Sequence, residues 1–194
     1  MNTSIIHVKK LALVIVFSAL GIAMSPFTVF VVFGTKANPT QHMVNAILGV
    51  LVGPFWAAIA AIFIGTIRNM LGMGTIFAFP GGIPGGIVVG ITYWILKHLK
   101  RSGKTRLISA LSEPIGTLLI GVPLALFLVA PWIGPQGFSK DLLNLTAKEG
   151  PWLAFLILGS WWGLSCVPGS IIGFIILLIL KKIGISRETL LGEK

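Results

Sequence analysis

Long apolar runs separated by short polar stretches dominate this chain, and five are visible, at 11–33, 43–67, 75–96, 107–131 and 151–180. A helix needs about 20 apolar residues to cross a hydrocarbon core roughly 30 Å thick. The first run holds 23 residues without a charge, which is too long for a signal-peptide core, and no small-residue cleavage site closes it. The pattern therefore predicts a helical integral membrane protein that keeps its first helix.

Basic residues gather at the ends of these runs and suggest the orientation of the chain. Lys9 and Lys10 precede the first run, and Lys181 and Lys182 follow the last. The densest cluster lies between the third and fourth runs: Lys97, Lys100, Arg101, Lys104 and Arg106. Short loops rich in lysine and arginine stay cytoplasmic, so an even number of crossings must separate the three clusters. Three runs, however, precede the central one.

The run 43–67 restores the parity if it forms two helices that are broken at Gly53–Pro54. Proline removes a helix hydrogen bond and glycine permits the turn. We therefore expect an all-α fold of six transmembrane helices with both termini cytoplasmic, in one domain over residues 1–194. The expected helices cover about 9–33, 39–53, 54–70, 80–97, 107–131 and 151–182, with a break near 163–169. Loops at about 34–40, 70–80 and 132–150 then lie outside.

The helix 39–53 would reach only about 22 Å. It is therefore either short and shielded by its neighbours or extended into the preceding loop.

Composition supports the membrane assignment and narrows the function. Hydrophobic residues make up 55% of the chain and charged residues 10%, with a mean hydropathy of +0.97, whereas soluble domains carry about 25% charged residues. The net charge of +10 sits at helix ends, where topology explains it, so no nucleic-acid partner is expected. A single cysteine, Cys166, excludes an internal disulfide, and we expect neither a metal nor a cofactor.

Polar side chains with recognition chemistry gather at the predicted outer side. Gln41 and Asn45 lie four residues apart and share one helix face, with His42 beside them. Together they offer uncharged donors and acceptors, which suit a small neutral heteroaromatic or alcohol ligand. The alternative is that they meet interfacial water or cap a helix.

A second polar group follows the third expected helix. Arg68 and Asn69 end that helix, Thr75 follows a glycine-rich turn, and Phe79 lies at the start of the next helix. Arg68 either snorkels into the interface or braces the loop and meets the ligand. The turn lacks the lysine and the preceding strand of a phosphate-binding loop.

The last run adds an aromatic pair. Trp161 and Trp162 lie about ten residues into it, near Ser165. There they can wall an aromatic-ligand pocket as readily as contact lipid.

Two further features have open roles. Glu113 is the only acidic residue inside an apolar run, with Thr117 one turn away. An intramembrane carboxylate is functional by default. We expect it about 9 Å into its helix, near the cytoplasmic end, as a proton site, a helix–helix hydrogen bond or a structural group. Ala19 and Ala23 on the first helix allow close helix approach, either within the subunit or as a docking face for another membrane subunit.

Enzyme chemistry is poorly represented, and we expect no catalytic activity. His42 lacks a matching serine motif, and no His-Glu-x-x-His sequence occurs. No nucleotide-binding loop is present either, so ATP-driven transport would need a motor from partner subunits.

Several motifs, in this order, resemble those of the ThiW family. They are Pro39-x-Gln41-His42-x-x-Asn45, Gly53-Pro54, Arg68-Asn69, Gly72-x-Gly74-Thr75-x-x-Ala78-Phe79-Pro80-Gly81 and Glu113-x-x-Gly116-Thr117. That family comprises substrate-binding S components of energy-coupling-factor (ECF) transporters for the thiamin precursor hydroxyethylthiazole. The resemblance implies a six-helix fold in the plasma membrane and an outward-facing site. It also implies a transmembrane T component, met by the small residues of the first helix, and two cytoplasmic ATPases.

On this reading the thiazole ring stacks against Phe79 and Trp161 or Trp162. Gln41, His42 and Asn45 then bind its nitrogen or hydroxyl. The alternatives are an S component for thiamin or hydroxymethylpyrimidine, a stand-alone secondary carrier or channel, and a purely structural membrane subunit. The absence of an acidic residue from the outer helices argues against cationic thiamin.

Overall fold

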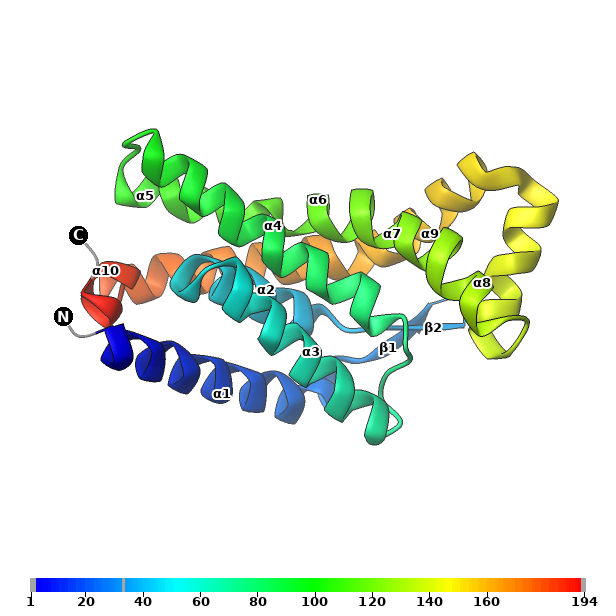
Figure 1. Ribbon diagram of the computed structural model, residues 1–194, viewed down its shortest axis with the longest axis horizontal. Helices are drawn as coiled ribbons and strands as arrows, with labels where there is room; N and C mark the ends of the chain where they lie inside the picture. The colour runs from blue at the N-terminus through cyan, green and yellow to red at the C-terminus, as the bar shows by residue number, and fades with distance from the viewer. Residues whose placement is uncertain (1–2, 33, 193–194) are drawn as a thin grey trace.

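Helices run along one long axis of the molecule, and both termini lie at the same end (Figure 1). The computed structural model describes residues 3–32 and 34–192. The helices are α1 (Thr3–Thr28), α2 (Pro39–Val52), α3 (Pro54–Met70), α4 (Ala78–His98), α5 (Gly103–Leu107), α6 (Glu113–Ile115), α7 (Val122–Leu124), α8 (Ala130–Ile133), α9 (Gly137–Lys182) and α10 (Arg187–Leu191). A 3-10 turn, η1 (Ile108–Ser112), and two π-helical stretches, η2 (Gly116–Gly121) and η3 (Ala125–Val129), join α5 to α8. Residues 103–133 are therefore one continuous helical run.

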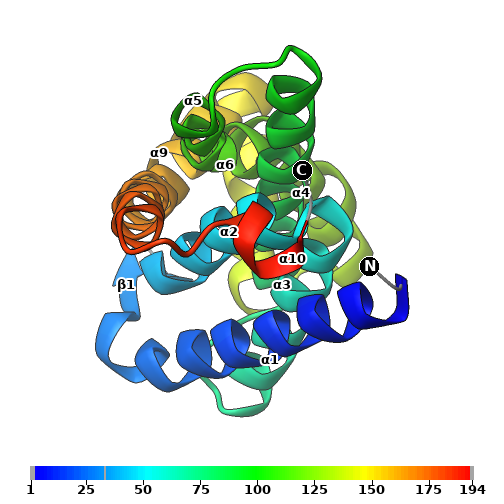
Figure 2. The same ribbon diagram turned by 90° about the vertical axis from the view of Figure 1, so that its left-hand side faces the viewer.

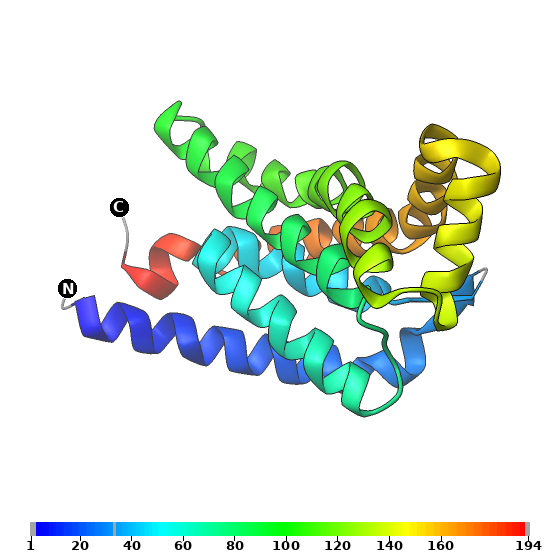
Figure 3. The same ribbon diagram turned by 45° about the vertical axis from the view of Figure 1, so that its right-hand side comes forward.

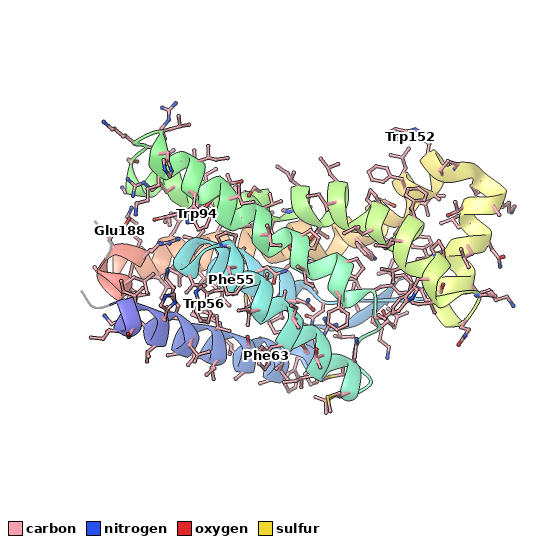
Figure 4. All side chains as sticks on the ribbon, in the orientation of Figure 1. Phe55, Trp56, Phe63, Trp94, Trp152 and Glu188 are labelled. Carbon is pink, nitrogen blue, oxygen red and sulfur yellow. The ribbon has the colours of Figure 1, made fainter. Side chains whose placement is uncertain are left out.

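Four helical runs of the described chain are long and apolar enough to cross a membrane, namely Ser4–Thr28, Ala78–His98, Gly103–Ile133 and Gly137–Lys182. The helix α3 is a shorter apolar helix. Large apolar side chains cover much of the outside, and Figure 4 shows Phe63 and Trp152 on opposite sides of the bundle. Trp152 is 71% exposed. Contiguous exposed apolar surface on this scale suits contact with lipid rather than with water.

The break at Gly53–Pro54 is present and divides the second apolar run into α2 and α3. Gly53 has φ +91°, a conformation that favours glycine, and Pro54 takes the first position of α3. The helix α2 is short, but nearly all of its residues are buried because it packs against α9, α4, α1 and α3. Figure 2 shows it surrounded by other helices. Of the two possibilities for this helix, the structure has the short, shielded one.

The segment after α1 differs from the expected first helix and loop. α1 ends at Thr28 rather than near residue 33, and a short antiparallel hairpin follows it. Strands β1 (Phe30–Val32) and β2 (Thr35–Ala37) pair with Phe30 opposite Ala37. The aromatic and β-branched residues after Thr28 favour strand, and Gly34 at φ +83° provides the turn.

The last helical run also breaks at a different place from the one expected. Within α9 the non-helical residue is Gly150, with φ +81°, and Pro151 starts the second part. Residues 137–149, expected as a loop, form the first part, which turns away from the rest (Figure 3). The glycines of 163–169 keep helical angles; a Cβ on Gly169 would meet the Pro39 carbonyl and His42. That glycine therefore permits close packing of α9 on α2 instead of a break.

A charged cluster joins the helices at the terminal end, where α10 lies across α1 and α2 (Figure 2). Arg187 donates to the Val50 carbonyl at 3.3 Å, and its guanidinium lies 5.1 Å from the centre of the Tyr93 ring. Glu188 accepts from Arg106 at 3.3 Å and from the Tyr93 hydroxyl at 3.4 Å. We call these four residues, Tyr93, Arg106, Arg187 and Glu188, the terminal cluster.

Candidate functional site

A pocket opens at the opposite end of the bundle, beside the hairpin, where the first turns of α2 and α4 meet the end of α3. Its empty space is about 430 Å³, a figure that includes the open mouth and the adjoining solvent. Residues of β2, α2, α3, the following loop, α4 and α9 line it: Lys36, Ala37, Asn38, Gln41, His42, Arg68, Thr75, Phe77, Ala78, Gly81, Trp162 and Ser165. Segments far apart in the sequence therefore form one cavity.

Gln41 and Arg68 form one buried polar pair on the wall. Arg68 is 2% exposed, donates through one terminal nitrogen to Gln41 Oε1 and through the other to the Met73 carbonyl at 3.1 Å. Since a guanidinium only donates, this contact settles which end of the amide is oxygen. The Gln41 amide nitrogen then reaches the Ala78 carbonyl at 3.4 Å, which leaves a second amide hydrogen for a ligand.

His42 and Glu113 form a second buried pair. His42 Nδ1 lies 2.7 Å from Glu113 Oε1. Asn45 Nδ2 and Thr117 Oγ1 reach the same carboxylate oxygen at 3.3 and 3.0 Å. Glu113, Asn45 and Thr117 are fully buried beneath His42. Two nitrogen donors, from His42 and Asn45, converge on one carboxylate oxygen, and the Thr117 hydroxyl lies within hydrogen-bonding distance of it, so the carboxylate is held against the imidazole.

The helical run that carries Glu113 begins at Gly103 rather than at the expected 107, so the residue lies ten positions along it, about 15 Å from its start. The backbone of α4 makes room for it, because a Cβ on Gly85 would lie 2.7 Å from both Glu113 Cδ and Thr117 Oγ1. Backbone carbonyls of α4 complete the arrangement: the Gly82 carbonyl accepts from Asn45 at 2.9 Å, and the Gly81 carbonyl lies 2.9 Å from Thr117 Oγ1, whose single hydrogen goes either to it or to Glu113.

Aromatic side chains close the pocket, although not all are the expected ones. Trp162 lines it and is 7% exposed, whereas Trp161 does not line it. Phe77 lines it and packs edge-on against Phe138, with ring centres 5.4 Å apart. Phe79, expected at the mouth, instead lies where a Cβ on Gly65 would meet its ring at 3.1 Å. Phe79 therefore packs against α3. It lies two positions after Phe77 at the start of α4, and side chains two positions apart on a helix point in different directions.

The structure thus brings most of the predicted site residues together. Those that line the pocket are Gln41, His42, Arg68, Thr75, Trp162 and Ser165. Asn45, Glu113 and Thr117 lie beneath His42, while Asn69, Phe79 and Trp161 are outside the lining. Ala19 and Ala23 are exposed on α1.

Six lining residues were not predicted as site residues, namely Lys36, Ala37, Asn38, Phe77, Ala78 and Gly81. The position of Asn38 could have been predicted, because an asparagine directly before a proline is typical of a helix N-cap. In the structure its side chain accepts a hydrogen bond from the Thr40 amide at 3.0 Å.

Buried polar atoms without a partner concentrate around this pocket. Five occur in the described part of the chain, and four belong to this region: Asn45 Oδ1, Arg68 Nε, Asn69 Oδ1 and Glu113 Oε2. Buried polar groups in folded proteins are nearly always hydrogen-bonded. Residues 3–32 and 34–192 contain no group of three or more histidine, cysteine or acidic side chains suited to a metal ion.

Comparison with known proteins gives one kind of match. A family model described as "Thiamine-precursor transporter protein (ThiW)" matches residues 11–183. No curated protein and no solved structure matches the chain.

Proposed function

Because the chain belongs to the ThiW family of thiamine-precursor transporter proteins, we propose that it is the substrate-binding S component of an ECF transporter and captures hydroxyethylthiazole. Family membership makes it a membrane transport protein for a thiamine precursor rather than an enzyme. The narrower assignment, to this substrate and this transporter class, rests on the motifs and on the chemistry of the pocket.

One observation carries the substrate assignment: the pocket combines aromatic walls with balanced, largely neutral polar groups. Trp162 and Phe77 offer faces or edges for a flat ring. Gln41 and His42 offer a donor and an acceptor within hydrogen-bonding range of such a ring. A small neutral heterocycle with one ring nitrogen and one hydroxyl matches this set.

The charges argue against thiamin as the ligand. Among the described residues that line the pocket, the charged ones are Lys36 and Arg68, and none is acidic. A cationic thiazolium would be repelled by them, since like charges at short range are destabilising. Hydroxymethylpyrimidine is neutral and remains the closer rival.

We further propose six crossings in the plasma membrane, with both termini cytoplasmic. The four long helices supply four crossings, while α3 and the shielded α2 supply the other two. The basic residues around α5 lie at the same end as the termini (Figure 1), which suits a cytoplasmic location. The pocket then faces outward.

The motor would come from partners. The sequence has no nucleotide-binding loop, so two cytoplasmic ATPases and a transmembrane T component would complete the transporter. The exposed Ala19 and Ala23 on α1 are available for close packing against the T component.

A titration tests this function directly. The purified chain in detergent is titrated with hydroxyethylthiazole while tryptophan fluorescence is followed, with thiamin and hydroxymethylpyrimidine as comparison ligands. We expect saturable quenching by the thiazole alone, lost in Trp162→Phe and retained in Trp152→Phe, whose ring is exposed. Quenching by a comparison ligand alone would change the substrate. ATP-independent transport by the chain alone in liposomes would instead favour a secondary carrier.

A further inference from the structure

Each neutral recognition residue of the pocket is held by one buried charge. Gln41 is held by Arg68, and His42 is held by Glu113. The two charges are opposite in sign and neither is more than 2% exposed. Buried charges are costly unless they are paired and hydrogen-bonded, so their placement behind two neutral side chains needs an explanation beyond packing.

The contact with Glu113 fixes the hydrogen-bonding character of His42. In a neutral imidazole one ring nitrogen carries a hydrogen and the other accepts, and the bond made by one nitrogen sets the role of the other. Nδ1 at 2.7 Å from a carboxylate oxygen is the donor. Nε2 is then the acceptor. It has no protein partner in the described chain, and about a tenth of the His42 side chain remains exposed in the pocket.

The contact with Arg68 has the complementary effect on Gln41. Its oxygen is engaged by the guanidinium, so the side chain presents N–H to the pocket. The cavity wall therefore offers one oriented donor, at Gln41, beside one oriented acceptor, at His42.

We infer that Glu113 is a positioning residue for ligand selection: it fixes the His42 tautomer so that Nε2 accepts a hydrogen bond from a ligand hydroxyl, while Gln41 donates to an acceptor on the same ligand. This inference deepens the proposed function and rests on it. It makes the hydroxyl, rather than the ring alone, the feature that the site selects. Glu113 acts through His42. We do not expect Glu113 to touch the ligand, because Glu113 is fully buried beneath His42.

Asn45 and Thr117 keep the Glu113 carboxylate in one orientation. Both lie within hydrogen-bonding distance of the carboxylate oxygen that faces His42, at 3.3 and 3.0 Å. Asn45 also donates to the Gly82 carbonyl of α4, and the Thr117 hydroxyl has the Gly81 carbonyl as its other acceptor. Outer partners of this kind orient an imidazole and set its tautomer in other binding sites. The carboxylate therefore has little freedom to release Nδ1.

The test compares two ligands in two proteins. Hydroxyethylthiazole and its methyl ether differ only in the hydroxyl hydrogen, and each is titrated against the wild-type chain and Glu113→Gln. A glutamine at 113 has nearly the same shape but no negative charge, so no anion holds the histidine hydrogen on Nδ1 and the tautomer with hydrogen on Nε2 becomes accessible. We expect the wild type to prefer the alcohol by at least about tenfold. In Glu113→Gln the affinity for the alcohol should fall about tenfold or more. The affinities for the alcohol and the methyl ether should then differ by no more than about threefold.

Glu149→Gln is the matched control, because Glu149 lies outside the pocket lining and pairs with Lys148 at 3.7 Å. It should bind both ligands as the wild type does. Equal losses of both ligands in Glu113→Gln would assign Glu113 a structural role only and overturn the inference, as would unchanged binding.

A spectroscopic measurement keeps the inference testable even if Glu113→Gln does not fold. The chain has three histidines, and His7 and His98 are exposed, so His7→Gln/His98→Gln leaves His42 alone for nitrogen-15 NMR. We expect a neutral ring with hydrogen on Nδ1. A hydrogen on Nε2 in the ligand-free protein overturns the inference. If the wild type binds neither ligand, the proposed function fails, and this spectrum still decides the role of Glu113.

Discussion

The pocket and the terminal cluster each combine a buried arginine with a glutamate, which is fully buried at the pocket and has a 39% exposed side chain in the terminal cluster. They leave their polar atoms in different states. At the terminal end, Arg187 meets a carbonyl and an aromatic ring, and Glu188 meets two donors. Around the pocket, Arg68 Nε and Glu113 Oε2 have no partner, whereas the terminal cluster contributes no such atom in the described chain.

This difference separates two uses of buried charge. A cluster that closes on itself stabilises the fold, because its desolvation cost is offset within the protein. The group around the pocket leaves buried polar atoms without a partner, so part of its desolvation cost is not offset and its placement requires a reason other than stability. Variants at the two ends should therefore separate stability from binding.

The largest expected effect is on stability, at the terminal end. Arg187→Met should lower the free energy of unfolding by about 2–4 kcal/mol, because it removes a buried charge-assisted hydrogen bond and a cation–π contact. Thermal unfolding in detergent measures the change. The affinity for hydroxyethylthiazole should stay within about threefold of wild type, and a larger loss would show that the two ends are coupled.

The converse change is Arg68→Met. We expect the dissociation constant for the thiazole to rise about 10- to 100-fold, since the Gln41 amide loses the partner that orients it. The thermal midpoint should fall less than in Arg187→Met, because Arg68 leaves one of its own nitrogens unpartnered. A variant that unfolds as readily as Arg187→Met would contradict the distinction between the two clusters.

A glycine substitution on α4 gives the next effect. Gly85→Ala places a methyl group 2.7 Å from Glu113 Cδ, so the carboxylate must move, at a cost of about 1–3 kcal/mol, and thiazole affinity should fall. Gly163→Ala is the matched control, with nothing within 4 Å of its Cβ. It should be neutral or stabilising by up to about 1 kcal/mol. Equal behaviour of the two variants in unfolding and titration would refute the packing argument.

The smallest effect concerns pH. Burial raises the pKa of Glu188, but the backbone amide, Ser186, Arg106 and Tyr93 outweigh it, and the net pKa lies below its usual 4.5. Its contribution to stability is therefore present above pH 4.5 and is lost as the pH falls through the lowered pKa. Thermal midpoints between pH 6 and the acid limit should fall slightly more for wild type than for Glu188→Gln. Parallel curves would show that Glu188 contributes nothing.

Much of the architecture could be predicted because it depends on local pattern. The apolar runs fixed the membrane class, and Gly53–Pro54 marked the boundary of α2 and α3 because a proline cannot continue a helix across that bond. The four-residue spacing of Gln41 and Asn45 placed both on one helix face. These are properties of neighbouring residues, and they do not depend on how the rest of the chain packs.

The sequence by itself determined that polar recognition groups lie within a helical membrane protein, since hydrophobicity and spacing are written along the chain. Only the tertiary structure decided which of them meet. Glu113 reaches His42, 71 positions away, because the glycines of α4 let side chains from two other helices approach its backbone. Phe77 rather than Phe79 faces the pocket, and Gly150 rather than 163–169 breaks α9. Rotation of a helix and the space beside a glycine depend on packing partners, which spacing along one chain does not encode.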